Sequence, residues 1–211
     1  MKVSGSFLKS NFDLKTTITR YEESIIDYIH VDMMDGKFVK NKTFTMGEIN
    51  KLLGKSQKPL DVHLMIKNPL KYLEDFALLN TEYYIFHFEA VSNVMDTINK
   101  IKEIGLKVGI SIKPKTKIKS IKEYLPYLDQ ILVMSVEPGK GGQTFIEKSL
   151  AKIIELKELK TKNNYTYIIS VDGGIDDITA PLVNTYGADM VVGGSYICAD
   201  DNFNDRINKL I

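Results

Sequence analysis

Short apolar runs of β-strand type alternate with amphipathic stretches of helical spacing along the whole of this 211-residue chain. Apolar-rich runs of this length between turn residues are typical of buried strands. Each run and the helical stretch after it take up about 26 residues, which fits one unit of a small barrel. We therefore predict an α/β fold, a (β/α)8 TIM barrel. The expected strands span 3–8, 27–34, 59–66, 83–88, 106–112, 129–136, 166–171 and 189–193.

The main alternative is an open, doubly wound sheet. No G-x-G-x-x-G motif follows the first expected strand, which disfavours the dinucleotide-binding form of that fold. The chain has no Pro/Gly/Ser-rich linker, no low-complexity tract and no shift in composition. Residues 1–211 are therefore expected to form a single domain.

Two of the helical stretches carry boundary signals. Asn68 is placed to cap a helix that has Pro69 in its first turn. Val94, Ile98 and Ile101 recur at helical spacing, and Gly105 is placed to end that helix.

Composition limits the partners and the compartment of the protein. The net charge is +1, so no bulk electrostatic attraction favours nucleic acid or a membrane surface. No apolar stretch is long enough to span a bilayer, and the start of the chain lacks the features of a signal peptide. Cys198 is the only cysteine, which excludes an intrachain disulfide and favours a reducing compartment. We expect a cytoplasmic protein.

Ionisable side chains fall toward the C-terminal ends of several expected strands. A buried ionisable group is costly without a partner, and in a barrel all eight strand ends of this kind meet at one face. That face is where a functional site is expected. The polar residues and glycine that would gather there are His30, Asp32, His63, His87, Glu89, Ser135, Asp172, Gly194 and Ser195.

Two imidazoles and two carboxylates among these residues suit a metal site. His30 and Asp32 are two residues apart in one strand, so their side chains point the same way. His63 lies on the next strand and Asp172 at the end of the seventh. This ligand set suits one Zn²⁺, Fe²⁺, Mn²⁺ or Co²⁺ ion. The structural alternative is a set of core histidines and helix-capping aspartates. The occurrence of four such residues at matching strand ends favours the metal site.

Three neighbouring residues allow more than one interpretation. Asp61 is expected to face the helices or the solvent, or to support the ligands. His87 and Glu89 share one side of the fourth strand. They are interpreted either as a hydrogen-bonded structural pair or as supporting groups or an extra ligand.

Glycines are concentrated after the sixth, seventh and eighth expected strands. Glycine lets backbone N–H groups approach an anion closely, and barrels often bind phosphate at the loops after strands seven and eight. Tight turns also need glycine, but three adjacent loops of this kind predict a phosphate site. Its residues would be Gly139, Lys140, Gly141, Gly142, Gly173, Gly174, Gly194 and Ser195.

Three methionines fall close to these polar groups at strand ends. They are Met34, Met65 and Met134. They are interpreted as core filling or as a flexible, polarizable lining of a sugar site.

Four segments in this order resemble the signatures of ribulose-phosphate 3-epimerases. They run from His30 to Val39, from Asp61 to Met65, from Met134 to Gln143 and from Val171 to Ile175. The resemblance extends from Ser6 to Ser195, in register with the expected barrel units.

The resemblance implies a (β/α)8 isomerase that interconverts D-ribulose 5-phosphate and D-xylulose 5-phosphate in the pentose phosphate pathway. It implies one divalent metal and no organic cofactor. The ligands would be His30, Asp32, His63 and Asp172, and the catalytic acid/base pair would be Asp32 and Asp172. Met34, Met65 and Met134 would line the site. Substrate contacts would fall on Ser6, His63, Gly139, Lys140, Gly141, Gly142, Asp172, Gly173, Gly174, Gly194 and Ser195.

Such an epimerisation requires two proton-transfer groups. Epimerisation at C3 removes a proton next to the C2 carbonyl and returns one to the opposite face of a planar enediolate. One group is needed on each face. Asp32 and Asp172 come from well-separated strands, which suits that arrangement.

The chain also departs from the family pattern. Gly5 stands where proline is usual and Lys140 where an aromatic residue is usual; Asn11 and Lys40 are further departures. Lys140 either adds a cation near the phosphate or points to solvent. None of these changes touches the expected ligands, but they leave the sugar open, so D-allulose 6-phosphate, a hexulose phosphate, is the alternative substrate.

Two further alternatives belong to other functional classes. A non-catalytic phosphosugar-binding barrel should lack one of the metal ligands or one of the two aspartates, and this chain has all of them. A barrel lyase or decarboxylase should place a lysine among the strand-end acids, where the nearest candidate is Lys113. The expected partner is a phosphorylated ketose, and a homo-oligomer is left open.

Overall fold

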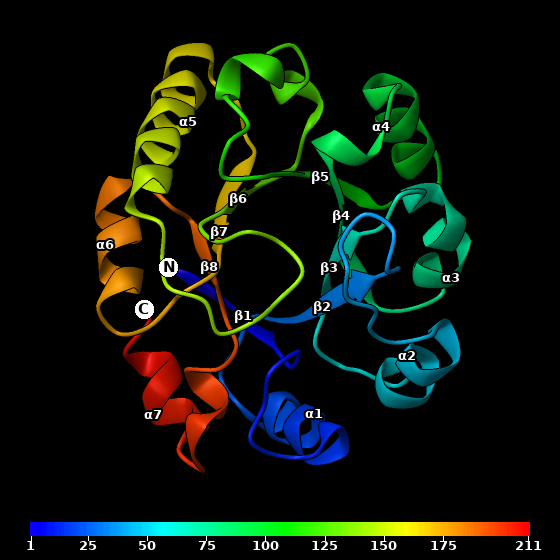
Figure 1. The fold of residues 1–211 in the computed structure, drawn as a ribbon, viewed down its shortest axis with the longest axis vertical. Coiled ribbons are helices and arrows are strands. Elements are labelled where there is room, and N and C mark those ends of the chain that lie inside the picture. Colours follow the sequence, from blue (N-terminus) through cyan, green and yellow to red (C-terminus); the bar gives the residue numbers. More distant parts are fainter.

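A computed structural model describes residues 1–211 and contains a closed eight-stranded barrel. Every strand pairs in parallel with the next, and β8 pairs with β1 (Figure 1). The (β/α)8 prediction is confirmed. The strands are β1 (Lys2–Ser6), β2 (Tyr28–Met34), β3 (Leu60–Met65), β4 (Thr81–His87), β5 (Lys107–Ile112), β6 (Gln130–Met134), β7 (Ile168–Asp172) and β8 (Met190–Gly193).

The predicted strand ranges agree with these bounds to within two residues at either end. β6 stops two residues before the predicted end. The backbone N–H of Ser135 still donates to Asp172 of β7, but its carbonyl oxygen accepts from Ile146 of the following loop at 2.8 Å. The Ser135 hydroxyl donates to the carbonyl oxygens of Asp172 at 2.9 Å and Gly173 at 2.6 Å. These bonds fix the end of β7 against the start of the loop that follows β6.

Helices surround the barrel and cover the outer faces of its strands (Figure 1). The α-helices are α1 (Leu14–Glu23), α2 (Met46–Leu53), α3 (Leu73–Ala77), α4 (Val94–Glu103), α5 (Leu150–Asn163), α6 (Thr179–Tyr186) and α7 (Phe203–Asn208). The short 3₁₀ helices are η1 (Pro69–Tyr72), η2 (Phe88–Ala90), η3 (Ile118–Ser120), η4 (Leu125–Tyr127), η5 (Glu147–Ser149) and η6 (Ile197–Ala199).

The connection between β5 and β6 contains no α-helix. It is made of η3 and η4, although the barrel pattern predicts a helix there. Pro126 lies near the end of this segment, in η4, where it removes a backbone donor and obstructs the preceding helical turn. Ile118, Ile121 and Leu125 are nevertheless buried, so the segment still covers the barrel.

The two helix-boundary predictions have different outcomes. Gly105 follows α4 with a φ of 87°, as expected for a glycine that ends a helix. The Asn68 cap is wrong, because its side chain makes no capping hydrogen bond. Pro69 begins a 3₁₀ helix instead, and α3 starts only at Leu73.

The apolar core lies mainly outside the barrel, between the strands and the helices, where 45 buried hydrophobic residues form one cluster. A smaller inner cluster lines the barrel itself. Its members are Tyr28, Tyr83, Ile85, Leu132, Met134, Val136, Met190 and Val192. The rest of the interior is polar, which is where the site is built.

A carboxylate lies at the centre of this polar interior. Asp61 has no solvent exposure and accepts hydrogen bonds from side chains on three other strands. The donors are the Ser4 hydroxyl at 3.0 Å, the Gln130 amide at 3.1 Å and Nδ1 of His30 at 2.7 Å. A buried charge needs such partners.

Gly5, one of the departures from the family pattern, has a structural explanation. A Cβ at this position would lie 2.7 Å from the ring of Tyr21, which is fully buried. The Tyr21 hydroxyl donates to the Ser6 carbonyl oxygen at 2.9 Å. Glycine here leaves room for a ring that holds the end of β1 in place.

No helix combines the length and apolar character that crossing a membrane requires.

Candidate active site

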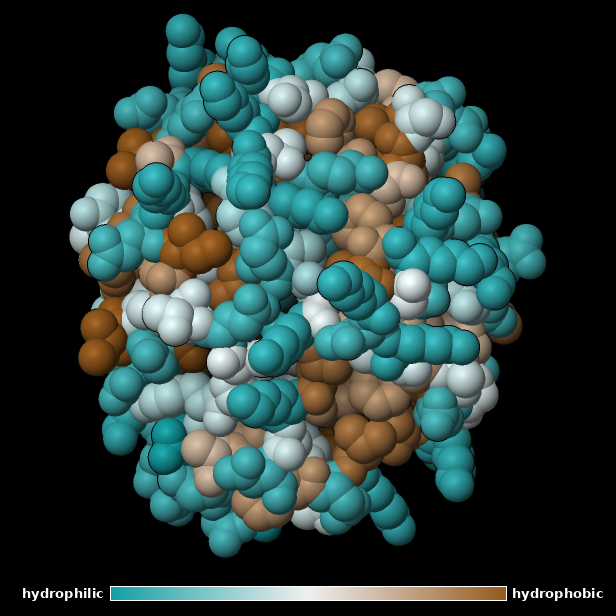
Figure 2. Space-filling model, in the orientation of Figure 1, coloured by the Kyte–Doolittle hydropathy of each residue, from teal (hydrophilic) through white to brown (hydrophobic).

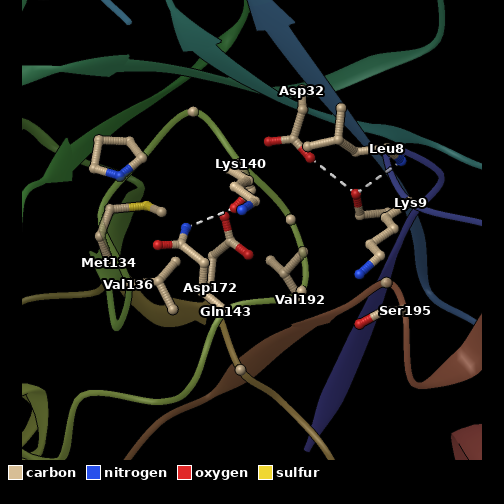
Figure 3. Close-up of a pocket in the computed structure, with 18 of the residues that line it drawn as sticks. Leu8, Lys9, Asp32, Met134, Val136, Lys140, Gln143, Asp172, Val192 and Ser195 are labelled. Carbon is tan, nitrogen blue, oxygen red and sulfur yellow. Dashed lines mark hydrogen bonds between the residues drawn. The ribbon is translucent and has the colours of Figure 1, made fainter. Parts of the chain in front are cut away.

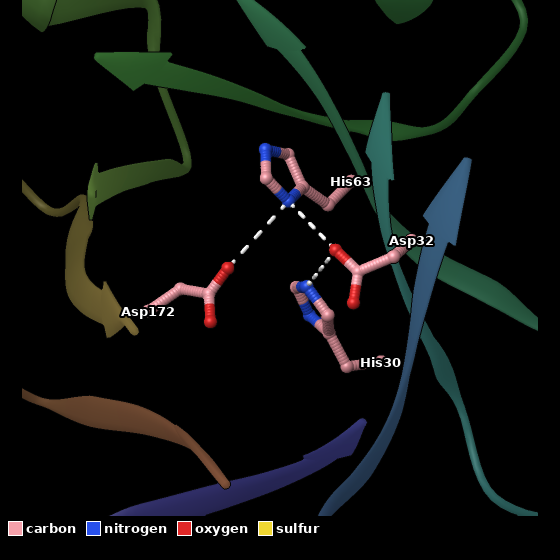
Figure 4. Close-up of side chains that lie close together, drawn as sticks. All are labelled: His30, Asp32, His63 and Asp172. Carbon is pink, nitrogen blue, oxygen red and sulfur yellow. Dashed lines mark hydrogen bonds and ion pairs between the residues drawn. The ribbon is translucent and has the colours of Figure 1, made fainter. Parts of the chain in front are cut away.

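Four predicted ligands come together inside the barrel, and three of them are in the C-terminal half of their strands (Figure 4). β2 contributes His30 and Asp32, β3 contributes His63, and β7 contributes Asp172. One ligand atom from each residue lies within 4.8 Å of the other three. Asp32 and His63 are register partners in neighbouring strands, which accounts for their contact.

The spacing of these atoms fits a small divalent cation. Ligands bound at about 2.0–2.1 Å around a tetrahedral ion lie roughly 3.3 Å from one another. Oδ1 of Asp32 lies 3.4 Å from Nε2 of His30 and 3.1 Å from Nδ1 of His63. Nδ1 of His63 lies 3.7 Å from Oδ2 of Asp172.

The state of His30 supports the same conclusion. Its Nε2 is buried and has no hydrogen-bond partner, which is costly for a ring nitrogen. Its Nδ1 contacts the Asp61 carboxylate, which can only accept, so Nδ1 keeps its proton and Nε2 is the nitrogen that a metal can bind once the ring is neutral. Nε2 faces the other three ligands, so these residues fit a metal ion.

The two aspartates differ in their electrostatic surroundings. Burial opposes ionisation of Asp32, but the imidazoles of His30 and His63 outweigh it and hold the pKa of Asp32 well below its usual value. Burial and the charge of Asp32 raise the pKa of Asp172 to about 6. Burial opposes the charge on His30 too, yet Asp32 and Asp61 hold its pKa well above the usual range. The pair of carboxylates therefore binds protons unequally.

Two positions differ from the sequence-based expectation. His30 is the third residue of β2 and lies within the barrel rather than at the strand end. Asp61 faces neither helices nor solvent but points into the barrel, because it is two residues from His63 and shares its side of β3. The expectation that Asp61 could support the ligands is the one that agrees with its bond to His30.

His87 and Glu89 lie behind His63, away from the other ligands. Nε2 of His87 is 2.9 Å from Nε2 of His63, and Nδ1 of His87 is 3.3 Å from Oε2 of Glu89. Burial lowers the pKa of His87 to about 4. Burial opposes ionisation of Glu89, but hydrogen bonds from His87, Thr116 and Lys113 lower its pKa to about 2.

A pocket opens above the ligand cluster at the mouth of the barrel (Figure 3). His30 and His63 are fully buried beneath it and do not line it. Most other predicted site residues do line it. These are Ser6, Asp32, Met34, Met65, Met134, Gly139, Lys140, Gly141, Gly142, Asp172, Gly173, Gly174, Gly194 and Ser195.

The loop after β6 crosses the centre of the barrel mouth (Figure 1). The same face carries mainly hydrophilic residues with hydrophobic patches between them (Figure 2). Gly173 and Gly174 have φ values of 114° and 65°, and a Cβ at Gly174 would lie 2.5 Å from the backbone nitrogen of Phe145. Only glycine fits there, so backbone lines this part of the pocket.

Lys9 is a pocket residue that sequence reasoning missed. Its ammonium group lies against Gly142, where an added Cβ would overlap Nζ. Lys9 and Ser195 lie on one side of the pocket in Figure 3. The only signal in the sequence is that Lys9 follows the Ser6 segment. Other lining residues that were missed are Leu8, Val136, Glu137, Pro138, Gln143, Ile175 and Val192.

Comparison with known proteins identifies the family. The sequence profile of the ribulose-phosphate 3 epimerase family matches residues 2–198. The chain belongs to the ribulose-phosphate 3-epimerase family. A ribulose-phosphate 3-epimerase from Treponema pallidum (strain Nichols) is 40% identical over 194 residues, covering 92% of this chain and 89% of the relative.

Other members and structures extend this comparison. A ribulose-phosphate 3-epimerase from Methanocaldococcus jannaschii is 37% identical over 211 residues, covering 100% of this chain and 89% of its own length. The crystal structure of 3-hexulose-6-phosphate synthase from Salmonella typhimurium aligns with a TM-score of 0.68 and 16% identity, covering 100% of this chain and 96% of that one. At that identity, the structural likeness supports the fold alone. The resemblance predicted from the sequence is confirmed, and this family member is an enzyme of the epimerase class.

The raised pKa of Asp172 predicts how the metal-free protein responds to pH. A carboxyl with a folded pKa of about 6 and an ordinary value of 3.8 binds more protons when folded, so it lowers stability as pH rises between these values. Asp172→Asn removes this cost. We expect the metal-free variant to be more stable than wild type at pH 8 by roughly 1–3 kcal/mol.

This gain should become small near pH 4, where the folded Asp172 is protonated and the unfolded carboxyl is partly protonated. Thermal unfolding of chelator-treated protein from pH 4 to pH 8 measures it. Asp177→Asn, on the same loop but exposed, is the control and should show no such trend. A gain that grows toward low pH would contradict the assignment.

Proposed function

We propose that this enzyme catalyses metal-dependent epimerisation at C3 of a ketose phosphate, converting D-ribulose 5-phosphate to D-xylulose 5-phosphate. The observation that carries the proposal is the convergence of Asp32 and Asp172 on one cluster of ligand atoms beneath the pocket. The names of its relatives support the same substrate.

His30, Asp32, His63 and Asp172 would hold one divalent cation. The mixed nitrogen and oxygen ligands accept Zn²⁺, Fe²⁺, Mn²⁺ or Co²⁺. Such an ion would supply Lewis-acid stabilisation of the negative charge that develops on a substrate oxygen. No organic cofactor enters the proposal.

Asp32 and Asp172 would carry the proton transfers. One carboxylate takes the C3 proton, and the electron pair moves toward the C2 carbonyl to give an enediolate. The other, protonated aspartate donates to C3 from the opposite face, which inverts that carbon. The aspartates extend from β2 and β7, on different sides of the pocket. Oδ2 of Asp32 accepts from Ser6 at 2.8 Å, which fixes the orientation of its carboxylate.

The glycine-lined side of the pocket would bind the phosphate. Gly142, Gly173 and Gly174 have positive φ values and bring backbone close to the pocket. Lys9 would add a positive charge at this end. Remote binding of phosphate positions the sugar without taking part in the chemistry.

The direct test is a coupled assay with ribulose 5-phosphate and allulose 6-phosphate, each supplied to metal-loaded and chelator-treated protein. We expect turnover of ribulose 5-phosphate, loss of activity on chelation and recovery when metal is restored. A preference for allulose 6-phosphate would reassign the substrate. Turnover of neither sugar would refute the epimerase proposal and leave a phosphosugar-binding barrel.

The aspartate roles predict a second result. Asp32→Asn and Asp172→Asn should each lower kcat by about 10²–10⁴-fold while the fold persists, because each loses a proton-transfer group. Steady-state kinetics and circular dichroism measure the two properties. Asp177→Asn is the matched control and should retain activity. Near-normal turnover in either site variant would remove that residue from the acid/base role.

The position of Lys9 predicts an effect on substrate binding. Lys9→Met should raise KM by about tenfold and leave kcat nearly unchanged, because the phosphate is remote from C3. Lys15→Met changes an exposed lysine of α1 and serves as the control. Equal KM values for the two variants would exclude Lys9 from phosphate binding.

A further inference from the structure

A series of hydrogen bonds runs from His63 across the mouth of the barrel to the loops after β4 and β5. Nε2 of His63 meets Nε2 of His87 at 2.9 Å, and Nδ1 of His87 meets Oε2 of Glu89 at 3.3 Å. Both histidines have no solvent exposure. The two ring nitrogens face each other, so a single proton lies between them. The hydrogen bond to the Glu89 carboxylate determines which ring carries that proton.

Glu89 is held as an acceptor. Its other oxygen, Oε1, accepts from the backbone N–H of Lys113 at 2.9 Å and from the Thr116 hydroxyl. Because a carboxylate has no proton to donate, the proton in its contact with His87 belongs to Nδ1 of that ring. Nε2 of His87 is then the acceptor in the contact with His63.

The donor-to-acceptor direction of these hydrogen bonds determines which nitrogen of His63 carries the proton. Its Nε2 must carry the proton that His87 accepts, so the neutral ring, which is the form that binds a metal, has its lone pair on Nδ1. Nδ1 is the atom that faces Oδ1 of Asp32 at 3.1 Å and Oδ2 of Asp172 at 3.7 Å. A metal ion needs a lone pair at that point.

We propose that His87 and Glu89 are positioning residues that hold His63 in the tautomer required to bind a metal through Nδ1. The proposal rests on the metal site proposed above. It assigns a role to two residues that contact neither the pocket nor the other ligands.

His30 supports this interpretation because it is held in a comparable way. A carboxylate, Asp61, contacts its Nδ1 at 2.7 Å, and the opposite nitrogen, Nε2, has no partner and faces the ligand cluster. The two histidines thus present different nitrogens, each with a carboxylate behind it. For His30 this carboxylate is in direct contact, whereas for His63 the contact passes through His87.

The His87 ring is also covered by an aromatic side chain. The ring of Phe38 lies 4.7 Å from that of His87, and Nζ of Lys113 lies 4.1 Å from the centre of the Phe38 ring. Phe38 is half-buried and comes from the loop after β2. This packing limits the access of water that would otherwise replace Glu89 as the partner of His87.

Glu89→Gln tests the donor-to-acceptor direction of these hydrogen bonds, because the glutamine side chain has almost the same shape as that of glutamate. The amide oxygen should keep the bonds from Lys113 and Thr116, which turns the amide N–H₂ toward His87. His87 would then carry its proton on Nε2 and donate to His63, leaving the His63 proton on Nδ1. We expect the affinity for Co²⁺ to fall by about 10–100-fold, with little change in the stability of the metal-free protein.

Three measurements decide the outcome. Competition with a chelator gives the Co²⁺ affinity, thermal unfolding of the metal-free forms gives stability, and ¹⁵N-histidine NMR locates the His87 proton. The expected NMR result is Nδ1 in wild type and Nε2 in Glu89→Gln. Glu103→Gln, an exposed change on α4, is the control and should leave all three unchanged.

The proposal would be overturned if Glu89→Gln bound Co²⁺ as tightly as Glu103→Gln does. It would also be overturned if the His87 proton of the wild-type protein were on Nε2. A purely structural role would lower the stability of the metal-free protein without moving the proton. The NMR result does not depend on turnover, so it separates this proposal from the proposed function. If wild type binds Co²⁺ but epimerises neither sugar, the function fails and the positioning role stands.

Discussion

The buried carboxylate of Asp61 is the interaction on which the site depends. It joins Ser4 of β1, His30 of β2 and Gln130 of β6 across the interior of the barrel. Without it, three buried polar side chains would lose their partner, which costs far more than a surface hydrogen bond. Asp61 also sets the orientation of His30, and the direction of the His30 lone pair defines where a metal can bind.

The barrel brings the rest of the site together. Parallel strands bring Asp32 and His63 into register, and closure brings β7 within reach of both. The three methionines are buried and line the pocket together with the glycine loops. Met34 and Met65 are each two residues beyond a ligand on their strands, and Met134 pairs with Asp172. In the proposed function, proton transfer would take place beside Asp32 and Asp172, and phosphate would bind at the glycine loops of the same pocket.

Local sequence patterns predict most of this fold. The strand ranges follow from apolar runs, and residues two apart on β2 are correctly expected to share a direction. The same rule places Asp61 beside His63, inside the barrel, and the expectation that it faces helices or solvent fails because it overlooks this spacing. The helix expected between β5 and β6 is replaced by two 3₁₀ helices, and Pro126 prevents a regular helix from continuing through the second.

Features that depend on loop conformation are not visible in the sequence. Lys9 reaches Gly142 only because the loops after β1 and β6 lie side by side, and no local signal predicts that contact. His87 and Glu89 share one side of a strand, which predicts a pair. The sequence does not reveal that His63 lies at the other end of this pair.

A crystal structure of the Co²⁺-loaded protein, with anomalous scattering measured at the cobalt edge, tests the central claim most directly. The account predicts one ion per chain, at about 2.0–2.2 Å from Nε2 of His30, Nδ1 of His63 and one oxygen each of Asp32 and Asp172. An ion bound elsewhere, or bound to His63 through Nε2, would contradict it.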